Sequence, residues 1–419
     1  MLKISAPKNF EIKGELDIPA SKSISNRCLI IEALCEEKID LENLSISDDT
    51  VILRNELSKI RQNTSNQNLE INVGMAGTAF RFLTAFLAIQ KGNFILTGHQ
   101  RLKERPIKPL VDALKQLGAD ISYLEKEGFA PLLINGKVLE EKNVSIPANI
   151  SSQFITALLL ISPSLKNGLT ISLQSETTSK PYIEMTLSLM KHFGVETNFK
   201  GNILEIKAKK YTSNHLFVEA DWSSASYFYE ILALAKSGNL VLKNFSKNSI
   251  QGDSKLATLF QEFGIATVFK NNSIFLSKTL FSKETFSYNF QNEPDLAQTF
   301  ITSSLALGKN TQLTGLQSLR IKETDRILAI KTEINKLGFD LKSKKINQED
   351  VFELVKNEGF QISKPIIFKT YNDHRMAMCL APFCLKYGEI SIENPEVISK
   401  SNPLFWNQLE VLGFEIERN

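Results

Sequence analysis

Apolar residues gather in runs that begin at a polar or small residue and are followed by a glycine. Five such runs recur along the chain, at 77–89, 151–161, 222–235, 295–307 and 373–385. A sixth run of the same build, at 22–34, lacks the glycine. Because apolar side chains occupy most faces of each run, we expect these segments to be helices buried inside a domain.

A second pattern follows each of the five glycines. Short strand-like runs come first, at 94–97, 169–173, 240–242, 311–313 and 390–392. A polar loop then leads to an amphipathic helix that closes on an apolar residue and a glycine, at 117–118, 193–194, 263–264, 337–338 and 412–413. Glycine supplies the left-handed residue that often ends a helix. The closures are roughly 70 to 76 residues apart, longer than a solenoid repeat of about 20–50 residues, so we predict a globular fold of six α/β units.

Six units suggest two domains of three units each, with a boundary near Ala220. The 419 residues agree with about two to three domains. No linker rich in proline, glycine or serine marks the boundary, which favours a hinge over a flexible tether. The pattern alone leaves residues 1–19 unassigned to either domain.

Composition excludes several classes of protein. Hydrophobic residues make up 42% of the chain and charged residues 23%, close to globular averages, so a disordered, collagen-like or coiled-coil protein is excluded. Lysine and arginine number 49 against 46 acidic residues, a net charge of +3. Such a balance does not predict a protein that binds nucleic acids or membrane surfaces. A small anionic substrate remains possible, but its basic site must be local.

No targeting or membrane segment stands out. The first residues contain no apolar signal core, and the most apolar run, 154–161, is far shorter than the roughly 20 residues of a membrane span. The four cysteines lie in apolar stretches without the spacing of a disulfide framework or a zinc site, so we expect small buried side chains. These features predict a soluble cytoplasmic protein.

The sequence also lacks the motifs of several enzyme classes. There is no GxGxxG fingerprint after a strand, no GxxxxGK[ST] loop, no HExxH or CxxC pattern and no GxSxG elbow. We therefore expect neither a dinucleotide enzyme nor a P-loop NTPase, and neither a metal nor another cofactor.

Ionisable and small polar residues recur at two matched places in the units. One is the start of the buried helix: Ser21, Lys22, Ser23, Arg27, Gly77, Thr78, Arg81, Ser151, Ser152, Gln153, Asp295, Asp373, His374 and Arg375. The other is the loop before the amphipathic helix: Arg101, Lys103, Arg105, Ser179, Lys180, Arg320, Lys322, Glu323, Arg326, Lys400 and Ser401. Helix N-termini attract phosphate and carboxylate groups. If the two domains present these ends to each other, the cleft would be strongly cationic.

Each of these residues also has a purely structural interpretation. Serine and glycine are common helix caps, Asp295 could cap its own helix, and His374 alone would more often be structural. Lys322 and Arg326 could form one solvated face. Recurrence in every unit except the fourth is what favours a site for a substrate carrying phosphate and carboxylate groups.

At these residues the chain resembles the 5-enolpyruvylshikimate-3-phosphate synthases of the enolpyruvyl transferase family. The matching segments are 19–27, 76–81, 102–106, 151–154, 179–182, 294–295, 320–326 and 371–378. They come in the family's order and span nearly the whole chain, and the segments around Lys22 and Lys322 are the most specific.

The resemblance implies an α/β (α+β) fold of two similar domains, each of three repeated βαβαββ-type units with buried helices. The N-terminal domain would span 20–219 and bind mainly shikimate 3-phosphate. The C-terminal domain would comprise 1–19 and 220–419, bind phosphoenolpyruvate and carry the catalytic carboxylates. The implied reaction transfers the enolpyruvyl group of phosphoenolpyruvate to the 5-hydroxyl of shikimate 3-phosphate, and the domains would close on the substrates.

The resemblance also assigns residues to roles. Asp295, Glu323 and Lys22 would be catalytic, with Asp295 taking the 5-hydroxyl proton and Glu323 protonating the methylene carbon of phosphoenolpyruvate. Shikimate 3-phosphate would be held by Lys22, Ser23, Arg27, Ser151, Ser152, Gln153, Ser179, Asp295, Ser318 and Lys322. Phosphoenolpyruvate would be held by Lys22, Gly77, Arg105, Gln153, Arg326, Arg375 and Lys400. No metal or cofactor is implied, and we expect a monomer.

Three departures from the family's pattern are visible. Met75 and Ser318 stand where the family usually has asparagine, and the segment between Asp49 and Gly74 lacks a Leu-Gly closure, which indicates a trimmed first unit. Gly77 followed by Thr-Ala resembles the members that are targets of glyphosate, with Met75 and Phe82 as unusual neighbours.

Two other functions remain open from the sequence. A UDP-N-acetylglucosamine enolpyruvyl transferase shares the fold and donor, but it carries a cysteine five residues before the arginine of an Arg-Pro pair, where this chain has Gln100 before Arg105. An anion-binding scaffold without activity would not need Asp295 and Glu323 beside its cations, because carboxylates weaken anion binding.

Overall fold

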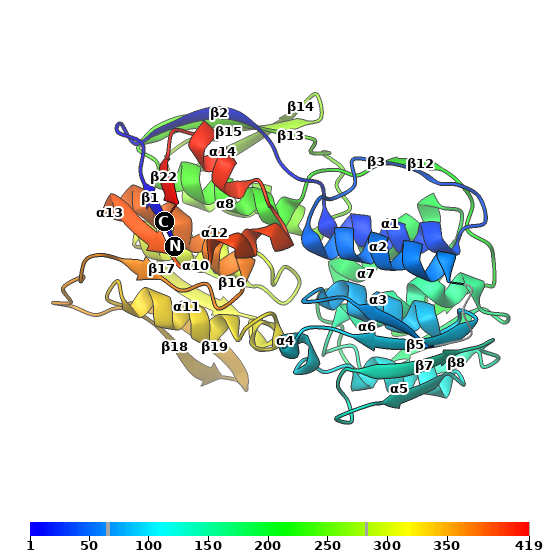
Figure 1. Cartoon of the computed structure of the whole chain (residues 1–419). Helices are drawn as coiled ribbons and strands as arrows, with labels where there is room; N and C mark the ends of the chain where they lie inside the picture. The colour runs from blue at the N-terminus through cyan, green and yellow to red at the C-terminus, as the bar shows by residue number, and fades with distance from the viewer. Residues whose placement is uncertain (64–67, 281–283, 419) are drawn as a thin grey trace. The chain divides into compact units, whose positions relative to one another are not determined.

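The chain is a mixed α/β protein with several small sheets and helices packed against them. The computed structural model describes residues 1–63, 68–280 and 284–418. The chain divides into two compact units, an N-terminal unit, Ser21–Val218, and a C-terminal unit made of Met1–Ala20 and Glu219–Asn419 (Figure 1). The predicted α/β fold of repeated units with buried helices is confirmed.

The N-terminal unit is built around three apolar helices, as the pattern predicts. These are α1 (Lys22–Leu34), α3 (Gly77–Ala88) and α6 (Ser152–Ile161), and α3 packs against α6 while α1 contacts both. Nearly every residue of α3 and α6 is buried. Three amphipathic helices accompany them, namely α2 (Asp48–Gln62), α5 (Lys108–Gln116) and α7 (Lys180–His192).

Two four-stranded sheets and one strand pair complete this unit. One sheet has the order β4 (Leu69–Asn72), β5 (Gly92–Thr97), β7 (Leu132–Gly136) and β6 (Asp120–Tyr123). The other has the order β10 (Thr197–Lys200), β11 (Ile203–Ile206), β9 (Leu169–Leu173) and β8 (Asn143–Ile146). The strand pair joins β3 (Asp40–Glu42) to β12 (His215–Phe217) in parallel.

The strand pair shows how the first repeat differs from the others. In the described part of the chain, it has two strands where the other repeats have four. This agrees with the trimmed first unit that the short segment between Asp49 and Gly74 indicates, although 64–67 of that segment lie outside the described residues.

The C-terminal unit also has three buried helices at its centre. They are α8 (Trp222–Leu234), α10 (Ala297–Leu307) and α12 (His374–Leu380), and each packs against the other two. The single helix expected over 373–385 is wrong. A 3-10 turn, Ala381–Phe383, separates α12 from α13 (Cys384–Tyr387), because Pro382 has no N–H to continue an α-helix.

Shorter helices follow the strands of this unit. The amphipathic segments form α11 (Arg326–Asn335), α14 (Phe405–Val411) and α9 (Leu256–Leu259), which continues into a 3-10 turn at Phe260–Phe263. Gly264, directly after that turn, has a φ of 77°, as expected of a left-handed helix end.

In the described residues of the C-terminal unit, each of three sheets has four strands. The first runs β20 (Ile367–Phe368), β21 (Glu389–Ile392), β1 (Leu2–Ser5) and β22 (Glu415–Arg418). The second runs β14 (Ile265–Lys270), β15 (Ser273–Lys278), β13 (Ser237–Lys243) and β2 (Glu11–Asp17). The third runs β16 (Thr285–Asn289), β17 (Asn310–Thr314), β19 (Glu349–Lys356) and β18 (Phe339–Ile346). The first residues of the chain, which the pattern left unassigned, thus supply two strands here.

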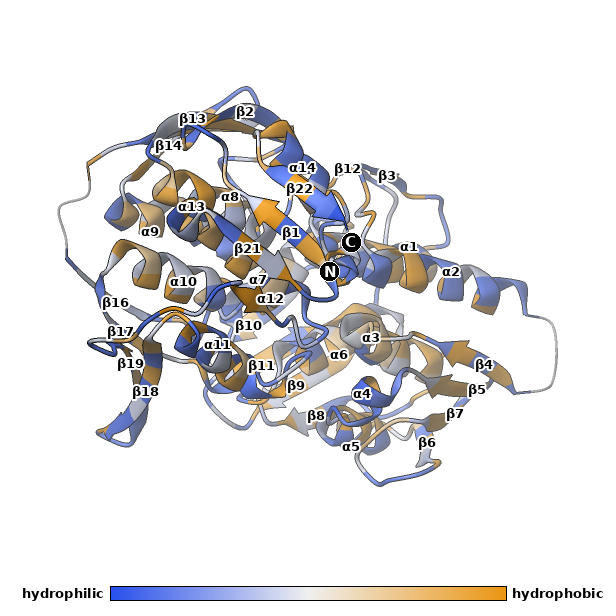
Figure 2. Cartoon of the chain, turned by 60° about the vertical axis from the view of Figure 1, so that its left-hand side comes forward, coloured by the Kyte–Doolittle hydropathy of each residue, from blue (hydrophilic) through white to orange (hydrophobic). Residues whose placement is uncertain are grey.

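Apolar side chains of these helices and sheets form the core. In the C-terminal unit, aromatic rings stack at its centre, with Phe286 and Phe300 at a centroid distance of 5.2 Å and Phe260 and Phe300 at 4.7 Å. Figure 2 shows apolar residues along the buried helices and polar residues along exposed α2 and the tip of the β18–β19 hairpin. Among the described residues, no helix combines the length and apolarity needed to cross a membrane.

Candidate functional site

A cluster of opposite charges lies in the C-terminal unit, where the starts of several helices meet. Asp295 stands just before α10, Arg326 is the first residue of α11, and Arg375 is in the first turn of α12. We call this group the charged cluster. Its members are Asp295, Lys322, Glu323, Arg326, Asp373, Arg375 and Lys400.

Arg326 is at the centre of the charged cluster and contacts three carboxylates. Its Nε donates to Asp373 at 2.7 Å, one Nη donates to Asp295 at 3.1 Å, and the other donates to Glu323 at 2.7 Å. The side chain is only 1% exposed. Burial opposes a charge on this guanidinium, but the three carboxylates outweigh it and raise the pKa of Arg326.

Asp295 is surrounded by cations and does not cap its helix. The Ncap residue of α10 is Leu296, so the capping role considered for Asp295 is not what the structure shows. Its carboxylate lies 2.8 Å from Arg375, 3.1 Å from Arg326 and 3.5 Å from Lys322. Burial would raise the pKa of Asp295, but these cations more than offset burial and hold it well below its usual range.

Glu323 lies between Arg326, which it shares with Asp295, and Lys400. Its carboxylate contacts Arg326 at 2.7 Å and Lys400 at 3.2 Å, and the side chain is 12% exposed. Burial lowers the pKa of the neighbouring Lys322, and Asp295 opposes that effect. Asp295 and Glu323 thus share Arg326, while Arg375 and Lys322 contact the first and Lys400 contacts the second.

Asp373 has a structural role in the charged cluster. It is the Ncap of α12, and its carboxylate accepts from the backbone N–H of Arg375 at 2.9 Å. The same carboxylate binds Arg326. Asp373 therefore fixes both arginines relative to the start of the helix. His374 beside it is buried, as its structural interpretation predicts.

The fourth unit contributes residues that the sequence reading missed. Asp253, in the loop before α9, accepts a hydrogen bond from Ser223 at the start of α8, and Tyr227 of α8 accepts one from Arg375 at 3.2 Å. Burial, with a further contribution from Asp295, raises the pKa of Asp253 to about 7. The pair Ser223-Ser224, which matches Ser151-Ser152 in the third unit, is the signal that could have revealed this contribution.

In the N-terminal unit, Lys22 and Arg27 extend from α1 to other helices. Lys22 pairs with the buried Asp49 of α2 at 3.5 Å. Arg27 is 2% exposed and donates to Thr186 at 2.8 Å, to the carbonyl of Tyr182 at 3.1 Å and to the carbonyl of Ser23 at 2.7 Å. Burial lowers the pKa of Arg27 to about 10. Arg27 therefore also ties α1 to α7.

Gly77, the first residue of α3, lies against two guanidinium groups. A β-carbon there would be 2.4 Å from an Nη atom of Arg105 and 2.8 Å from one of Arg81. Arg81 is held in place by the carbonyl of Gly77, to which it donates at 2.8 Å. Only glycine leaves room for both arginines at this helix start, so close approach explains this glycine.

The remaining polar candidates of this unit lie at the starts of α6 and α7. Ser151 is the Ncap of α6, and its hydroxyl accepts from the N–H of Gln153 at 3.3 Å. The side-chain amide of Gln153 donates to Thr78 of α3 at 3.1 Å. Ser152 is buried, and Ser179 is the Ncap of α7 in a left-handed conformation with φ of 55°.

Several cations of the predicted loops are paired at the surface and do not join these groups. The pairs are Arg101–Glu104, Lys103–Glu125, Lys180–Glu184 and Arg320–Asp325. These four cations are therefore surface residues outside the charged cluster, whereas Arg326, for which a solvated face was considered, is buried. Ser318 lies half-buried in a 3-10 turn, Gln317–Ile321.

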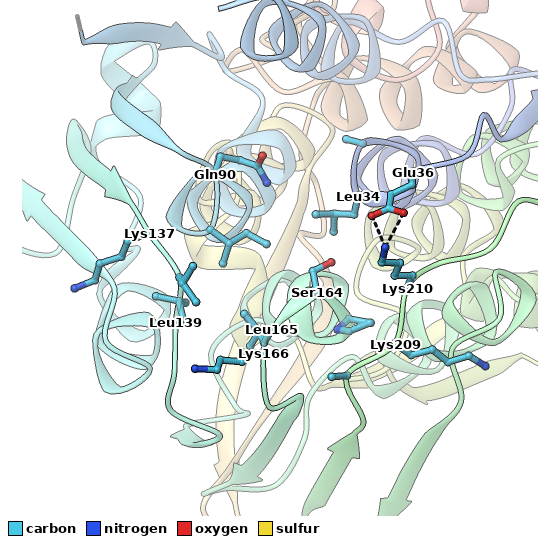
Figure 3. Close-up of a pocket in the computed structure, with 15 residues that line it drawn as sticks. Leu34, Glu36, Gln90, Lys137, Leu139, Ser164, Leu165, Lys166, Lys209 and Lys210 are labelled. Carbon is cyan, nitrogen blue, oxygen red and sulfur yellow. Dashed lines mark hydrogen bonds and ion pairs between the residues drawn. The ribbon is translucent and has the colours of Figure 1, made fainter. Parts of the chain in front are cut away.

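A cavity in the N-terminal unit is lined by none of these residues. Figure 3 shows this cavity, about 560 Å³ in volume, which is lined by the C-terminal ends of α1 and α3 and by the turn that follows α6. Lysines line it, and Lys210 pairs with Glu36 at 2.7 Å. Lys166, which also lines the cavity, pairs with Glu140 at 3.0 Å.

Comparisons with known proteins identify the family. The family model of EPSP synthase (3-phosphoshikimate 1-carboxyvinyltransferase) matches residues 7–409. A protein of Bacteroides fragilis (strain YCH46) named 3-phosphoshikimate 1-carboxyvinyltransferase is 43% identical over 415 residues, which cover 99% of this chain and 98% of that protein. A protein of the same name from Vibrio campbellii is 35% identical over 431 residues, which cover 96% of this chain and 97% of that protein.

The fold agrees with a solved structure. The EPSP synthase from Acinetobacter baumannii superposes with a TM-score of 0.77 over 100% of both chains at 20% sequence identity, a likeness of fold. Together with the family match over nearly the whole chain and the two relatives, this establishes that the chain belongs to the EPSP synthase (3-phosphoshikimate 1-carboxyvinyltransferase) family.

Proposed function

We propose that this protein transfers the enolpyruvyl group of phosphoenolpyruvate to the 5-hydroxyl of shikimate 3-phosphate and releases phosphate, a step of aromatic amino acid biosynthesis. The observation that carries the proposal is the charged cluster, in which Asp295 and Glu323 each lie among cations. Cations can hold two anionic substrates together despite their repulsion, and carboxylates beside them can move protons.

We carry the proposed binding residues over from the resemblance position by position, with Ser318 in the place of the family's asparagine. Shikimate 3-phosphate would be bound by Lys22, Ser23, Arg27, Ser151, Ser152, Gln153, Ser179, Asp295, Ser318 and Lys322. Phosphoenolpyruvate would be bound by Lys22, Gly77, Arg105, Gln153, Arg326, Arg375 and Lys400. We also propose that the protein is a monomer and that it acts in the cytoplasm. Residues of both units must reach the substrates, which domain closure would achieve.

The proposed chemistry is an addition followed by an elimination. Asp295 accepts the proton of the 5-hydroxyl as its oxygen bonds to C2 of phosphoenolpyruvate, and Glu323 donates a proton to the methylene carbon, which becomes a methyl group. The product of this step is a tetrahedral ketal phosphate. In the elimination, Glu323 takes a proton back from the methyl group and Asp295 returns its proton as phosphate leaves. The ammonium group of Lys22 would offset charge that develops on the phosphate.

The electrostatics of the charged cluster explain how Asp295 can act as a base. Burial would raise the pKa of Asp295, but Arg375, Lys322 and Arg326 more than offset burial and keep it well below its usual range, which makes the carboxylate a weak base. Phosphate and carboxylate groups of bound substrates would share these cations. The pKa of Asp295 would then rise, so substrate binding itself would prepare the base.

A phosphate-release assay tests this function. We expect phosphate only when phosphoenolpyruvate and shikimate 3-phosphate are both present. Release with UDP-N-acetylglucosamine in place of shikimate 3-phosphate would support the related enolpyruvyl transferase instead. Absence of release with either acceptor would support the anion-binding scaffold.

The variant Glu323→Gln tests the proposed proton transfer. An amide is similar in size but cannot donate the proton, and a general acid typically contributes about 10²–10⁴-fold, so kcat should fall by that factor. Glu358→Gln is the matched control, because Glu358 is an exposed glutamate of the same unit. Wild-type turnover in Glu323→Gln would refute the role of Glu323 without refuting the function.

A further inference from the structure

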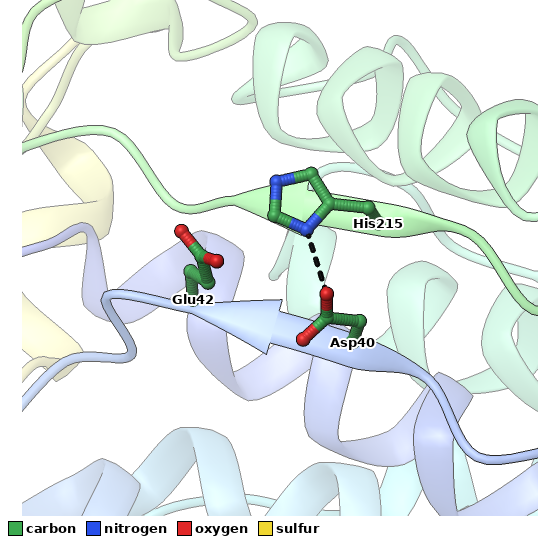
Figure 4. Close-up of side chains that lie close together, drawn as sticks. All are labelled: Asp40, Glu42 and His215. Carbon is green, nitrogen blue, oxygen red and sulfur yellow. Dashed lines mark hydrogen bonds and ion pairs between the residues drawn. The ribbon is translucent and has the colours of Figure 1, made fainter.

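Three side chains that could bind a metal lie on one face of the strand pair β3–β12. The two strands are parallel, and His215 is directly opposite Asp40, while Glu42 lies two residues farther along β3. Because side chains alternate between the faces of a strand, Asp40 and Glu42 point to the same side. Figure 4 shows both carboxylates near the His215 ring.

The distances suit a common metal ion. His215 Nδ1 is 3.1 Å from Asp40 Oδ2. Two ligands of a tetrahedral zinc ion, each bonded at about 2.0–2.1 Å, are about 3.3 Å apart, so this pair already has the required spacing. One ligand atom from each of the three residues lies within 4.8 Å of the others. A small rotation of the Glu42 side chain can therefore complete the set.

Hydrogen bonds outside the triad hold the two strands in place. The side chain of Asn43 donates to the carbonyl of Val218 at 2.8 Å, directly after both strands. His192 Nε2 donates to the carbonyl of His215 at 2.9 Å, and Asn214 donates to the carbonyl of His192 at 3.2 Å. The backbones that carry the three ligands are thus fixed before any metal binds, which reduces the entropic cost of binding.

The donor set indicates the class of metal. One imidazole and two carboxylates match the nitrogen and oxygen ligands of zinc and of neighbouring divalent transition metals, whereas magnesium and calcium prefer oxygen alone. All three residues are exposed, so water can reach the site and complete the coordination. We propose that Asp40, Glu42 and His215 form a surface site for a divalent transition-metal ion, with Zn²⁺ the best match.

The site would join parts of the chain that are distant in sequence. Asp40 and His215 are 175 residues apart, near the two ends of the N-terminal unit. A metal held by both strands would bind the folded unit and not the unfolded chain, and would stabilise the unit by mass action. Since none of the three ligands belongs to the charged cluster, the role of the metal would be structural and separate from the proposed transfer reaction.

Isothermal titration calorimetry with Zn²⁺ on the full-length protein tests the site. Wild type should bind one ion, and Glu42→Gln should bind it at least about tenfold more weakly, the effect that removal of even an outer-shell partner typically has. Glu42→Gln retains the length of the side chain and leaves the His215–Asp40 hydrogen bond intact. His215→Ala should lose binding, and Zn²⁺ should raise the melting temperature of wild type but not of His215→Ala.

Matched controls distinguish this site from weak binding elsewhere. Glu205→Gln removes another glutamate of a strand in the same unit, and His99→Ala removes another exposed histidine, so both should bind Zn²⁺ like wild type. Equal affinity of wild type, Glu42→Gln and His215→Ala would overturn the proposal. So would the absence of a wild-type binding isotherm, which would leave the triad as a cross-strand hydrogen bond with a solvated glutamate beside it.

Discussion

Arg326 is the most buried cation of the charged cluster. Its guanidinium contacts Asp295, Glu323 and Asp373 from a side chain that is 1% exposed. A planar group with donors in several directions can satisfy three carboxylates at once, which the single ammonium of lysine cannot do in the same way. Removal of this group would leave three carboxylates with fewer partners.

We therefore predict that Arg326→Gln destabilises the C-terminal unit. Loss of one partner of a buried ion pair typically costs about 3–5 kcal/mol. Urea denaturation followed by tryptophan fluorescence measures this cost, because Trp222 and Trp406 both belong to the C-terminal unit. Arg320→Gln is the control, since its pair with Asp325 is exposed and should contribute less than about 1 kcal/mol. Similar losses in the two variants would contradict the central position of Arg326.

Asp253 predicts a pH dependence of stability. Burial raises the pKa of this carboxyl to about 7 in the folded protein, from 3.8. Between these two values the folded state binds the proton more tightly than the unfolded state, so the contribution of Asp253 to stability falls as pH rises from about 4 to about 7. Asp295, Asp221 and Arg375 are the charged groups that influence it.

The variant Asp253→Asn should remove this pH dependence. Relative to wild type, it should gain stability between pH 5 and pH 8, measured by the same fluorescence-detected denaturation. If the difference in unfolding free energy between Asp253→Asn and wild type were the same at pH 5 and at pH 8, Asp253 would already be ionised at pH 5.

At the scale of elements, the start of α3 links a backbone requirement to the proposed binding of phosphoenolpyruvate. A β-carbon at Gly77 would collide with the ends of Arg105 and Arg81, which are flexible enough to move. We predict that Gly77→Ala displaces these guanidinium groups, raises KM for phosphoenolpyruvate more than it lowers kcat, and hardly changes stability. Steady-state kinetics with both substrates varied provides the measurement.

Gly118→Ala is the control, and its expected effects on stability and KM are the reverse of those of Gly77→Ala. Gly118 ends α5 with a φ of 93°, and a β-carbon there would meet no atom within 4 Å. A left-handed conformation costs an alanine roughly 1–2 kcal/mol, so this variant should lose stability and retain KM. A higher KM in Gly118→Ala and a normal KM in Gly77→Ala would refute the argument from close approach.

The elements also show where the pattern of apolar residues predicts well. Apolar runs ending at glycine located the buried helices, because burial on most faces leaves a long and nearly continuous signal. The break between α12 and α13 was missed, although Pro382 marks it. The strands β3 and β12 were missed too, because each has three residues and neither precedes or follows a glycine closure.

For the site, the sequence predicted residue types but not their partners. Recurrence at the starts of buried helices pointed to Asp295 and Arg375, and recurrence in the loops before amphipathic helices pointed to Arg326. The structure brings these three residues together. The contribution of Asp253 and Tyr227 was not predicted. Their side chains reach the charged cluster only through the packing of α8 against α10 and α12, which no local pattern encodes.

At the scale of the whole molecule, the sixfold repeat predicts two sets of three units, and two compact units are found. The position of the first residues, by contrast, was not predicted by the repeat. β1 lies between β21 and β22, so Leu2 pairs with both Ile392 and Arg418. Such long-range pairing could not be read from local periodicity, because β1 contains only four residues.

The interior position of β1 has a consequence for synthesis on the ribosome. The N-terminal unit is one continuous stretch, Ser21–Val218, and can fold as soon as it has emerged. The strand β1 precedes this stretch in the sequence, whereas its two partner strands, β21 and β22, follow it. β1 therefore has to stay unpaired while the whole N-terminal unit is translated, until β21 and β22 have emerged.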